Sequence, residues 1–136
     1  MNLVMKKITE YLESKDIRYI LSDDDKRLEL RFSAKNADVI PVLMNCQEEE
    51  DCEFFVYNYC KFPEEKREKM YELCSKMNKK FRWLRFFVDE SDNTITIATD
   101  LLINPDSCAD DVYTILAKIV RIGDFAYPEF MKTIWT

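Results

Sequence analysis

Residues 28–60 read LELRFSAKNADVIPVLMNCQEEEDCEFFVYNYC, and this stretch decides the fold. Apolar and polar side chains alternate in it, and β-branched and aromatic residues are frequent, which is typical of strands with one buried face. Pro41 cannot donate a backbone hydrogen bond, so we expect an edge or a bulge at that point. With the alternating run that precedes this stretch, the sequence predicts a four-stranded antiparallel meander. Its strands are Ile17–Leu21, Leu28–Phe32, Val39–Cys46 and Glu53–Cys60.

Helices are predicted before and after these strands, because apolar residues there recur at spacings of three and four. Asn104-Pro105 marks the start of the last helix, and Gly123 is expected near its end. The element order is α-β-β-β-β-α-β-β-α, which indicates an α+β fold whose mainly antiparallel sheet has helices on one face. The remaining predicted elements are helices over residues 2–15, 62–81 and 104–123 and strands over residues 84–88 and 95–97.

Length and composition favour one domain over residues 1–136. The chain is 47% hydrophobic, which is enough to build a core without stabilising metals or disulfides. No apolar run approaches the roughly 18 residues of a membrane span, and no apolar signal segment begins the chain, so we expect a cytoplasmic protein that does not enter membranes. A net charge of −6 also works against binding to nucleic acid.

The sequence offers no chemistry-bearing motif. It has no His, the commonest general base and metal ligand, and its single Gly cannot form a phosphate-binding glycine loop. The five Cys contain no C-x-x-C pair, so we expect reduced and mostly buried thiols. The acidic turn at residues 89–93 lacks the Gly and the final Glu of a calcium loop, and residues 23–25 read as a solvated turn. We therefore expect no metal, no cofactor, no catalytic residues and no enzyme activity.

A basic stretch over residues 76–85 contains Phe81 and Trp83 and could in principle bind nucleic acid. The predicted helix before it begins with glutamates and ends with lysines, an order that complements the helix dipole without any partner. We favour this structural interpretation.

Aromatic residues on both faces of the predicted sheet suggest a binding surface. One face must cover the core, and a single helical layer would leave part of the other face exposed. Alternatively, a further helix covers that second face. The candidate partner-binding residues are Tyr57, Tyr59, Trp83 and Phe87.

The second half of the chain resembles a known family. Met77–Phe81 runs into Arg85–Asp89, followed by Thr94–Ile97 and by a helix that closes on Asp124–Pro128. This pattern resembles the YbjN-like family of small bacterial domains, and with the preceding elements the resemblance covers most of the chain. It implies a type III secretion chaperone-like fold, frequent dimers, and a description as sensory-transduction regulators. Asn78, the polar residue of the pattern, could contact a ligand, but we favour a structural role in satisfying backbone groups.

Two functions follow from these observations. The first is a non-enzymatic module, possibly a homodimer, that binds a protein or peptide through the aromatic surface or an open edge of the sheet. The alternative is a regulatory or sensory domain that binds a small ligand in the groove between the helices and the sheet. A pocket in the structure would favour the second.

Overall fold

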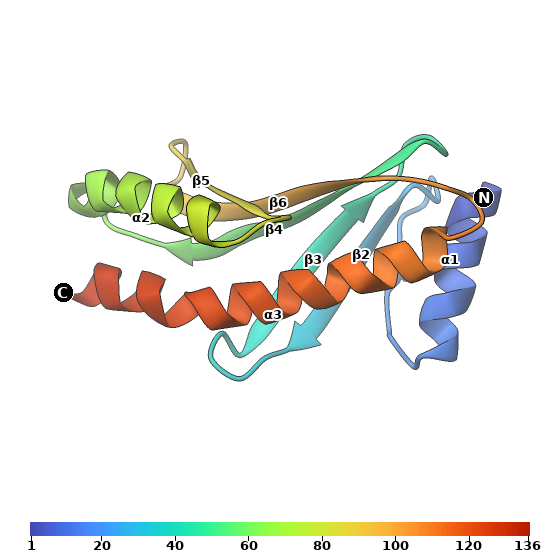
Figure 1. Cartoon of the computed structure of the whole chain (residues 1–136), viewed down its shortest axis with the longest axis horizontal. Coiled ribbons are helices and arrows are strands. Elements are labelled where there is room, and N and C mark those ends of the chain that lie inside the picture. Colours follow the sequence, from blue (N-terminus) through green and yellow to red (C-terminus); the bar gives the residue numbers. More distant parts are fainter.

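The alternating strands form one antiparallel sheet of six strands, in the order β1-β2-β3-β4-β6-β5 (Figure 1). The computed structural model describes all 136 residues. Four strands follow one another as the predicted meander, and the last hairpin places β6 beside β4 and β5 at the edge. The α+β fold class and the element order are confirmed. The elements are α1 (Leu3–Ser14), β1 (Ile20–Leu21), β2 (Arg27–Ser33), β3 (Val39–Asn45), β4 (Asp51–Lys61), the 3-10 turn Glu64–Lys66, α2 (Arg67–Lys80), β5 (Arg85–Asp89), β6 (Thr94–Leu102) and α3 (Cys108–Trp135).

The helices gather on one side of the sheet and close a single core. In Figure 1, α3 crosses in front of β2 and β3, with α1 at one end and α2 beside β5. The core is one cluster of 33 buried residues drawn from the three helices and from the inward-facing positions of the strands. None of the helices combines the length and the apolar character that crossing a bilayer requires.

The last helix is longer than the sequence predicts. It was expected to end near Gly123, but α3 continues through Gly123 and Pro128 to Trp135. Gly123 is buried, and an added Cβ would lie 3.3 Å from the side chain of Ile40. The glycine therefore marks a close approach of helix to sheet, and the expected helix end is wrong because packing overrides its low helix propensity.

Asp124 joins α3 to the tip of the β2–β3 hairpin. Its carboxylate accepts hydrogen bonds from the backbone N–H groups of Lys35, Asn36 and Ala37, at 3.3, 2.7 and 2.9 Å. Pro128 has no N–H to offer the carbonyl of Asp124, and the side-chain amide of Asn36 donates to that oxygen at 3.2 Å instead. These bonds lower the pKa of Asp124, that from Ala37 contributing most.

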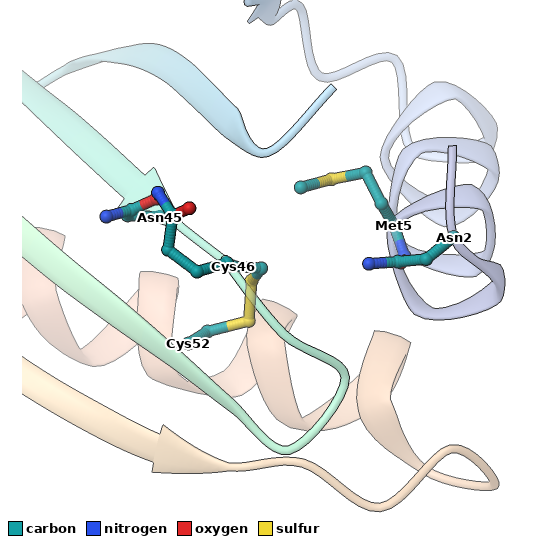
Figure 2. Close-up of a disulfide and its surroundings, with 6 residues drawn as sticks. Asn2, Met5, Asn45, Cys46 and Cys52 are labelled. Carbon is teal, nitrogen blue, oxygen red and sulfur yellow. A yellow bond between two sulfur atoms is a disulfide. The ribbon is translucent and has the colours of Figure 1, made fainter. Parts of the chain in front are cut away.

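The β3–β4 hairpin explains two features of the sequence. Along β3, all seven residues pair with β2 but only Leu43–Asn45 pair with β4, so Pro41 lies where the β4 side of the strand is unpaired. This is the local edge that the proline predicts. The pairing of Asn45 with Glu53 then brings Cys46 opposite Cys52, and a disulfide joins them at the base of the acidic loop, with Met5 of α1 pointing toward it (Figure 2).

The disulfide corrects the expectation that all five cysteines are thiols, and its cause is the strand register. Cys46 and Cys52 are six residues apart in the sequence, a spacing that forms no known motif. The hairpin nevertheless places their Cα atoms 4.4 Å apart, within reach of a disulfide. The other three cysteines are buried free thiols, as expected.

The hydrogen bonds from the β2–β3 hairpin to the carboxylate of Asp124 predict a pH-dependent contribution to stability. Because the folded-state pKa of Asp124 lies below its unfolded value, the ionised carboxylate stabilises the fold above about pH 4, and this contribution is lost as the pH falls through the lowered pKa. We expect Asp124→Asn to destabilise the protein at pH 7. The difference in unfolding free energy from wild type should shrink on acidification, as measured by urea denaturation at several pH values. Asp23→Asn, at an exposed turn, is the matched control and should show no such pH-dependent difference.

Candidate functional site

The face of the sheet opposite the helices is open to solvent. Tyr57 on β4 and Phe87 on β5 lie on this face and are 50% and 40% exposed. Trp83 is 62% exposed but lies on the other side, with the ammonium group of Lys118 from α3 over its ring. The structure therefore brings two of the four candidate residues to one face and places Trp83 elsewhere.

Tyr59 lies in the core and does not belong to the exposed set. Its hydroxyl donates to the carbonyl of Gly123 at 2.6 Å, and its ring contacts those of Phe86 and Phe130 edge to face. Period two would place Tyr59 on the same face as Tyr57, but a bulge between Val56 and Cys60 shifts the register. Asn58, with φ of 51°, reverses the direction of the side chain that follows, which no local alternation predicts.

A pocket of about 680 Å³ lies on the open face, between β1 and β4. Its apolar lining includes Ile20 on β1, Leu43 on β3 and the stacked rings of Phe55 and Tyr57 on β4. The centroids of these two rings are 5.0 Å apart. We call it the β2–β4 pocket. The sequence predicts a ligand groove between the helices and the sheet, whereas this pocket lies on the opposite face. No residue of the three helices lines it. Its remaining lining residues are Arg18, Tyr19, Glu29, Leu30, Arg31, Pro41 and Val42.

The charged groups of the β2–β4 pocket are Arg18, Glu29 and Arg31. Glu29 and Arg31 are two residues apart on β2 and share the open face, while Arg18 comes from the segment that leads into β1. None of the three forms a salt bridge; the four ion pairs of the structure lie elsewhere. The pocket therefore carries two guanidinium groups and one carboxylate, none of them in a salt bridge.

Unpaired backbone groups add to the polar side of the pocket. Ile20 pairs with Glu29, and the next hydrogen-bonded pair of an antiparallel ladder would be Arg18 with Arg31. No backbone hydrogen bond joins those two residues, because the chain leaves β2 after only two paired positions. An N–H and a C=O of Arg31 thus face the segment at Arg18 without a strand partner, at the point where both residues line the pocket.

The opposite edge of the sheet is closed by a side chain. The amide of Asn78 accepts from the N–H of Phe86 at 2.6 Å and donates to its carbonyl at 3.0 Å, as a neighbouring strand would. The structural role expected of Asn78 is confirmed, but its partner is β5 and not the end of its own helix. The two edges therefore differ, because a side chain takes the place of a strand at Phe86 but none does so at Arg31.

The buried thiols of Cys60 and Cys74 are poor nucleophiles. Burial raises the pKa of the thiols of Cys60 and Cys74 to about 12, so both stay protonated and unreactive at neutral pH. No group of three or more acidic or Cys side chains could hold a metal ion.

The β2–β4 pocket combines an apolar lining with two arginines, which suits binding of a ligand with an apolar body and an anionic group. Sequence reasoning missed Arg18 and Arg31, whose only signal is their alternation with apolar residues.

Comparisons with known proteins agree on the fold. The model of the YbjN family, described as "Putative bacterial sensory transduction regulator", matches residues 6–131. A solved structure, "Crystal structure of YbjN, a putative transcription regulator from E. coli", superposes with a TM-score of 0.64 and 13% identity over 92% of both chains. At that identity the likeness concerns the fold alone. No curated protein matches the chain.

Two neighbouring tyrosines test these side-chain positions. Tyr59→Phe should lower the free energy of unfolding by about 1 kcal/mol, because it removes a buried hydrogen bond to Gly123. Tyr57→Phe is the matched control and should change it by less than about 0.5 kcal/mol, because its hydroxyl lies on the exposed face. Urea denaturation followed by circular dichroism measures both. Equal losses for the two variants would contradict the assignment of the two faces.

Proposed function

Because this chain belongs to the YbjN family, we propose that it is a regulatory domain whose signal is a small amphipathic anion bound in the β2–β4 pocket. One observation carries the proposal: a cavity of about 680 Å³ combines an apolar lining with two arginines that have no carboxylate partner. A cavity of this size suits a small molecule, since ligand pockets commonly measure about 300–1,000 Å³. The family description supports the regulatory role.

The lining indicates how such a ligand would lie. Its apolar or aromatic body packs against Phe55 and Tyr57, whose rings are nearly parallel, at 12°. Its acidic group accepts from the guanidinium groups of Arg18 and Arg31, which favour carboxylate, sulfonate and phosphate oxygens. Glu29 disfavours a second acidic group close to it, so a ligand with one anionic end fits best.

Regulation would act through the segment that carries Arg18. This segment connects α1 to the sheet, and α1 packs on α3. A ligand held by Arg18 and Arg31 together ties the segment to β2 where the strand ladder itself has stopped. The bound ligand therefore favours the state in which α1 is fixed relative to the sheet over a state in which it is not. The change in free-energy difference between these two states equals the difference in the ligand's binding free energy for them.

The same face supports a second candidate function, that of a protein- or peptide-binding module. Beyond Glu29, β2 has no partner strand on its outer side, so an extended peptide could pair with Arg31. Tyr57, which is exposed and lines the adjoining pocket with Arg31, would contact its side chains, whereas Phe87 lies on β5 at the opposite edge of the sheet.

Two fluorescent probes with the same aromatic frame test the ligand class. The anion 8-anilinonaphthalene-1-sulfonate should bind the wild-type chain more tightly than neutral N-phenyl-1-naphthylamine. Arg31→Gln should weaken binding of the anion about tenfold, or 1.4 kcal/mol, because it removes a charge-assisted hydrogen bond. Binding of the neutral probe should be unchanged. Fluorescence titration measures all four affinities.

Controls locate the probe and separate the two candidate functions. Arg27→Gln, on the same face of β2 but outside the pocket, should leave both affinities unchanged. Amide chemical-shift changes should concentrate in residues 18–20, 29–31 and 55–57. Probe-induced shifts elsewhere, or an anion affinity insensitive to Arg31→Gln, would overturn the small-ligand proposal. Specific binding of an extended peptide along residues 30–33, with no response to either probe, would favour the second candidate.

A further inference from the structure

The turn between α2 and β5 holds a bulky aromatic residue in an uncommon backbone conformation. Six residues have positive φ, and five of them are Asp or Asn, which tolerate it; the sixth is Trp83, with φ of 78°. This conformation costs stability, and Trp83 does not offset the cost by burial, since it is 62% exposed. Packing of the core therefore gives no reason for a tryptophan at this position.

Cationic side chains lie over the rings of Trp83 and of the nearby exposed Phe125. The ammonium group of Lys118 lies 5.8 Å from the centre of its ring, and that of Lys80 lies 5.1 Å from the ring of Phe125, which is 61% exposed. Arg121 lies on α3 between Lys118 and Phe125, at spacings of three and four that share one face of the helix. We call this surface the Trp83 patch. It consists of Lys80, Arg82, Trp83, Lys118, Arg121 and Phe125.

The positive charge of the Trp83 patch is not neutralised within the chain. Its four cations form no salt bridge, although the chain has 26 acidic residues and a net charge of −6. Complementing the helix dipole accounts for Lys80 at the end of α2, as the sequence suggests, but not for Lys118 and Arg121 in the middle of α3. Cations over exposed aromatic rings form a surface suited to carboxylates and apolar contacts.

The chain itself carries a matching surface. Residues 47–51 form the tip of the β3–β4 hairpin, where four carboxylates are exposed and make no salt bridge. The disulfide at the base of this acidic loop restrains it, which lowers the entropy lost on docking. Figure 1 places the loop at the end of the sheet beside α1, away from the C-terminal end of α2, so the two surfaces do not meet within one copy. The four carboxylates belong to Glu48, Glu49, Glu50 and Asp51.

We propose that the Trp83 patch binds the acidic loop of a second copy of this chain. Four carboxylates then face four cations, with Trp83 and Phe125 supplying apolar contact at the centre. Nucleic acid is a weaker fit because a chain of net charge −6 repels a polyanion. Two reciprocal contacts close a symmetric dimer. This proposal is independent of ligand binding, because the Trp83 patch lies on the helical side and the β2–β4 pocket on the opposite face.

Charge reversal tests the proposal by sedimentation velocity on the full chain. Lys80→Glu with Arg82→Glu and Lys118→Glu reverses the patch, and Glu48→Lys with Glu49→Lys and Glu50→Lys reverses the loop. We expect wild type to associate, each reversed variant alone to be monomeric, and an equimolar mixture of the two to associate again. Trp83→Ala should weaken wild-type association at least about tenfold, as at a central aromatic contact.

Matched variants make the outcome decisive. Glu10→Lys with Glu65→Lys and Glu72→Lys changes the net charge as much as the loop reversal does, at exposed sites away from the loop, and should preserve association. Circular dichroism and anilinonaphthalene-sulfonate binding should be unchanged in the patch variant, which shows that the fold and the pocket are intact. A monomeric wild type, association that survives both reversals, or a mixture that stays monomeric would overturn the proposal. So would binding of a single-stranded oligonucleotide that the patch reversal abolishes.

Discussion

The close approach of α3 to the sheet at Gly123 is the contact on which the rest of the structure depends. A methyl group there would lie 3.3 Å from the side chain of Ile40 and 3.5 Å from that of Ile97, so Ile40 would have to shift slightly to admit even an alanine. At this distance the hydroxyl of Tyr59 reaches the helix backbone, and Asp124 reaches the tip of the β2–β3 hairpin. One long helix is thus fixed across the meander and closes the core from one side.

Closing the core from one side leaves the other face of the sheet uncovered. Most exposed apolar residues of a protein need no explanation, but Ile20 and Tyr57 of the open face line one cavity together with the partly buried Phe55. The charged groups that line this cavity form no salt bridge, whereas the carboxylate of Asp124 accepts three hydrogen bonds from the hairpin. The same contrast holds on the helical side for the cations around Trp83.

Periodicity in the sequence predicts the fold well, because β2 and β3 bury every second residue and each helix buries a single stripe. It failed where a local pattern was overridden by a distant contact. Gly123 looked like a helix end, since the strand it packs against is more than eighty residues away at Ile40. Tyr59 looked like a surface residue, since the positive φ of Asn58 cannot be read from alternation. The β2–β4 pocket depends on where the β1–β2 ladder stops, and the side chains around it carry no motif.

The two edges of the sheet show why the site lies beside β2. An exposed strand edge invites unwanted pairing, and the chain prevents this at β5 by the amide of Asn78, which satisfies both backbone groups of Phe86. At β2 the short strand β1 covers the edge instead, but its pairing does not extend beyond Ile20 and Glu29. If stability alone set this edge, continuing the ladder to Arg18 would add hydrogen bonds at little cost. Leaving Arg31 unpaired at the lip of an apolar cavity instead exposes a donor, an acceptor and a guanidinium group, which the proposed ligand would use.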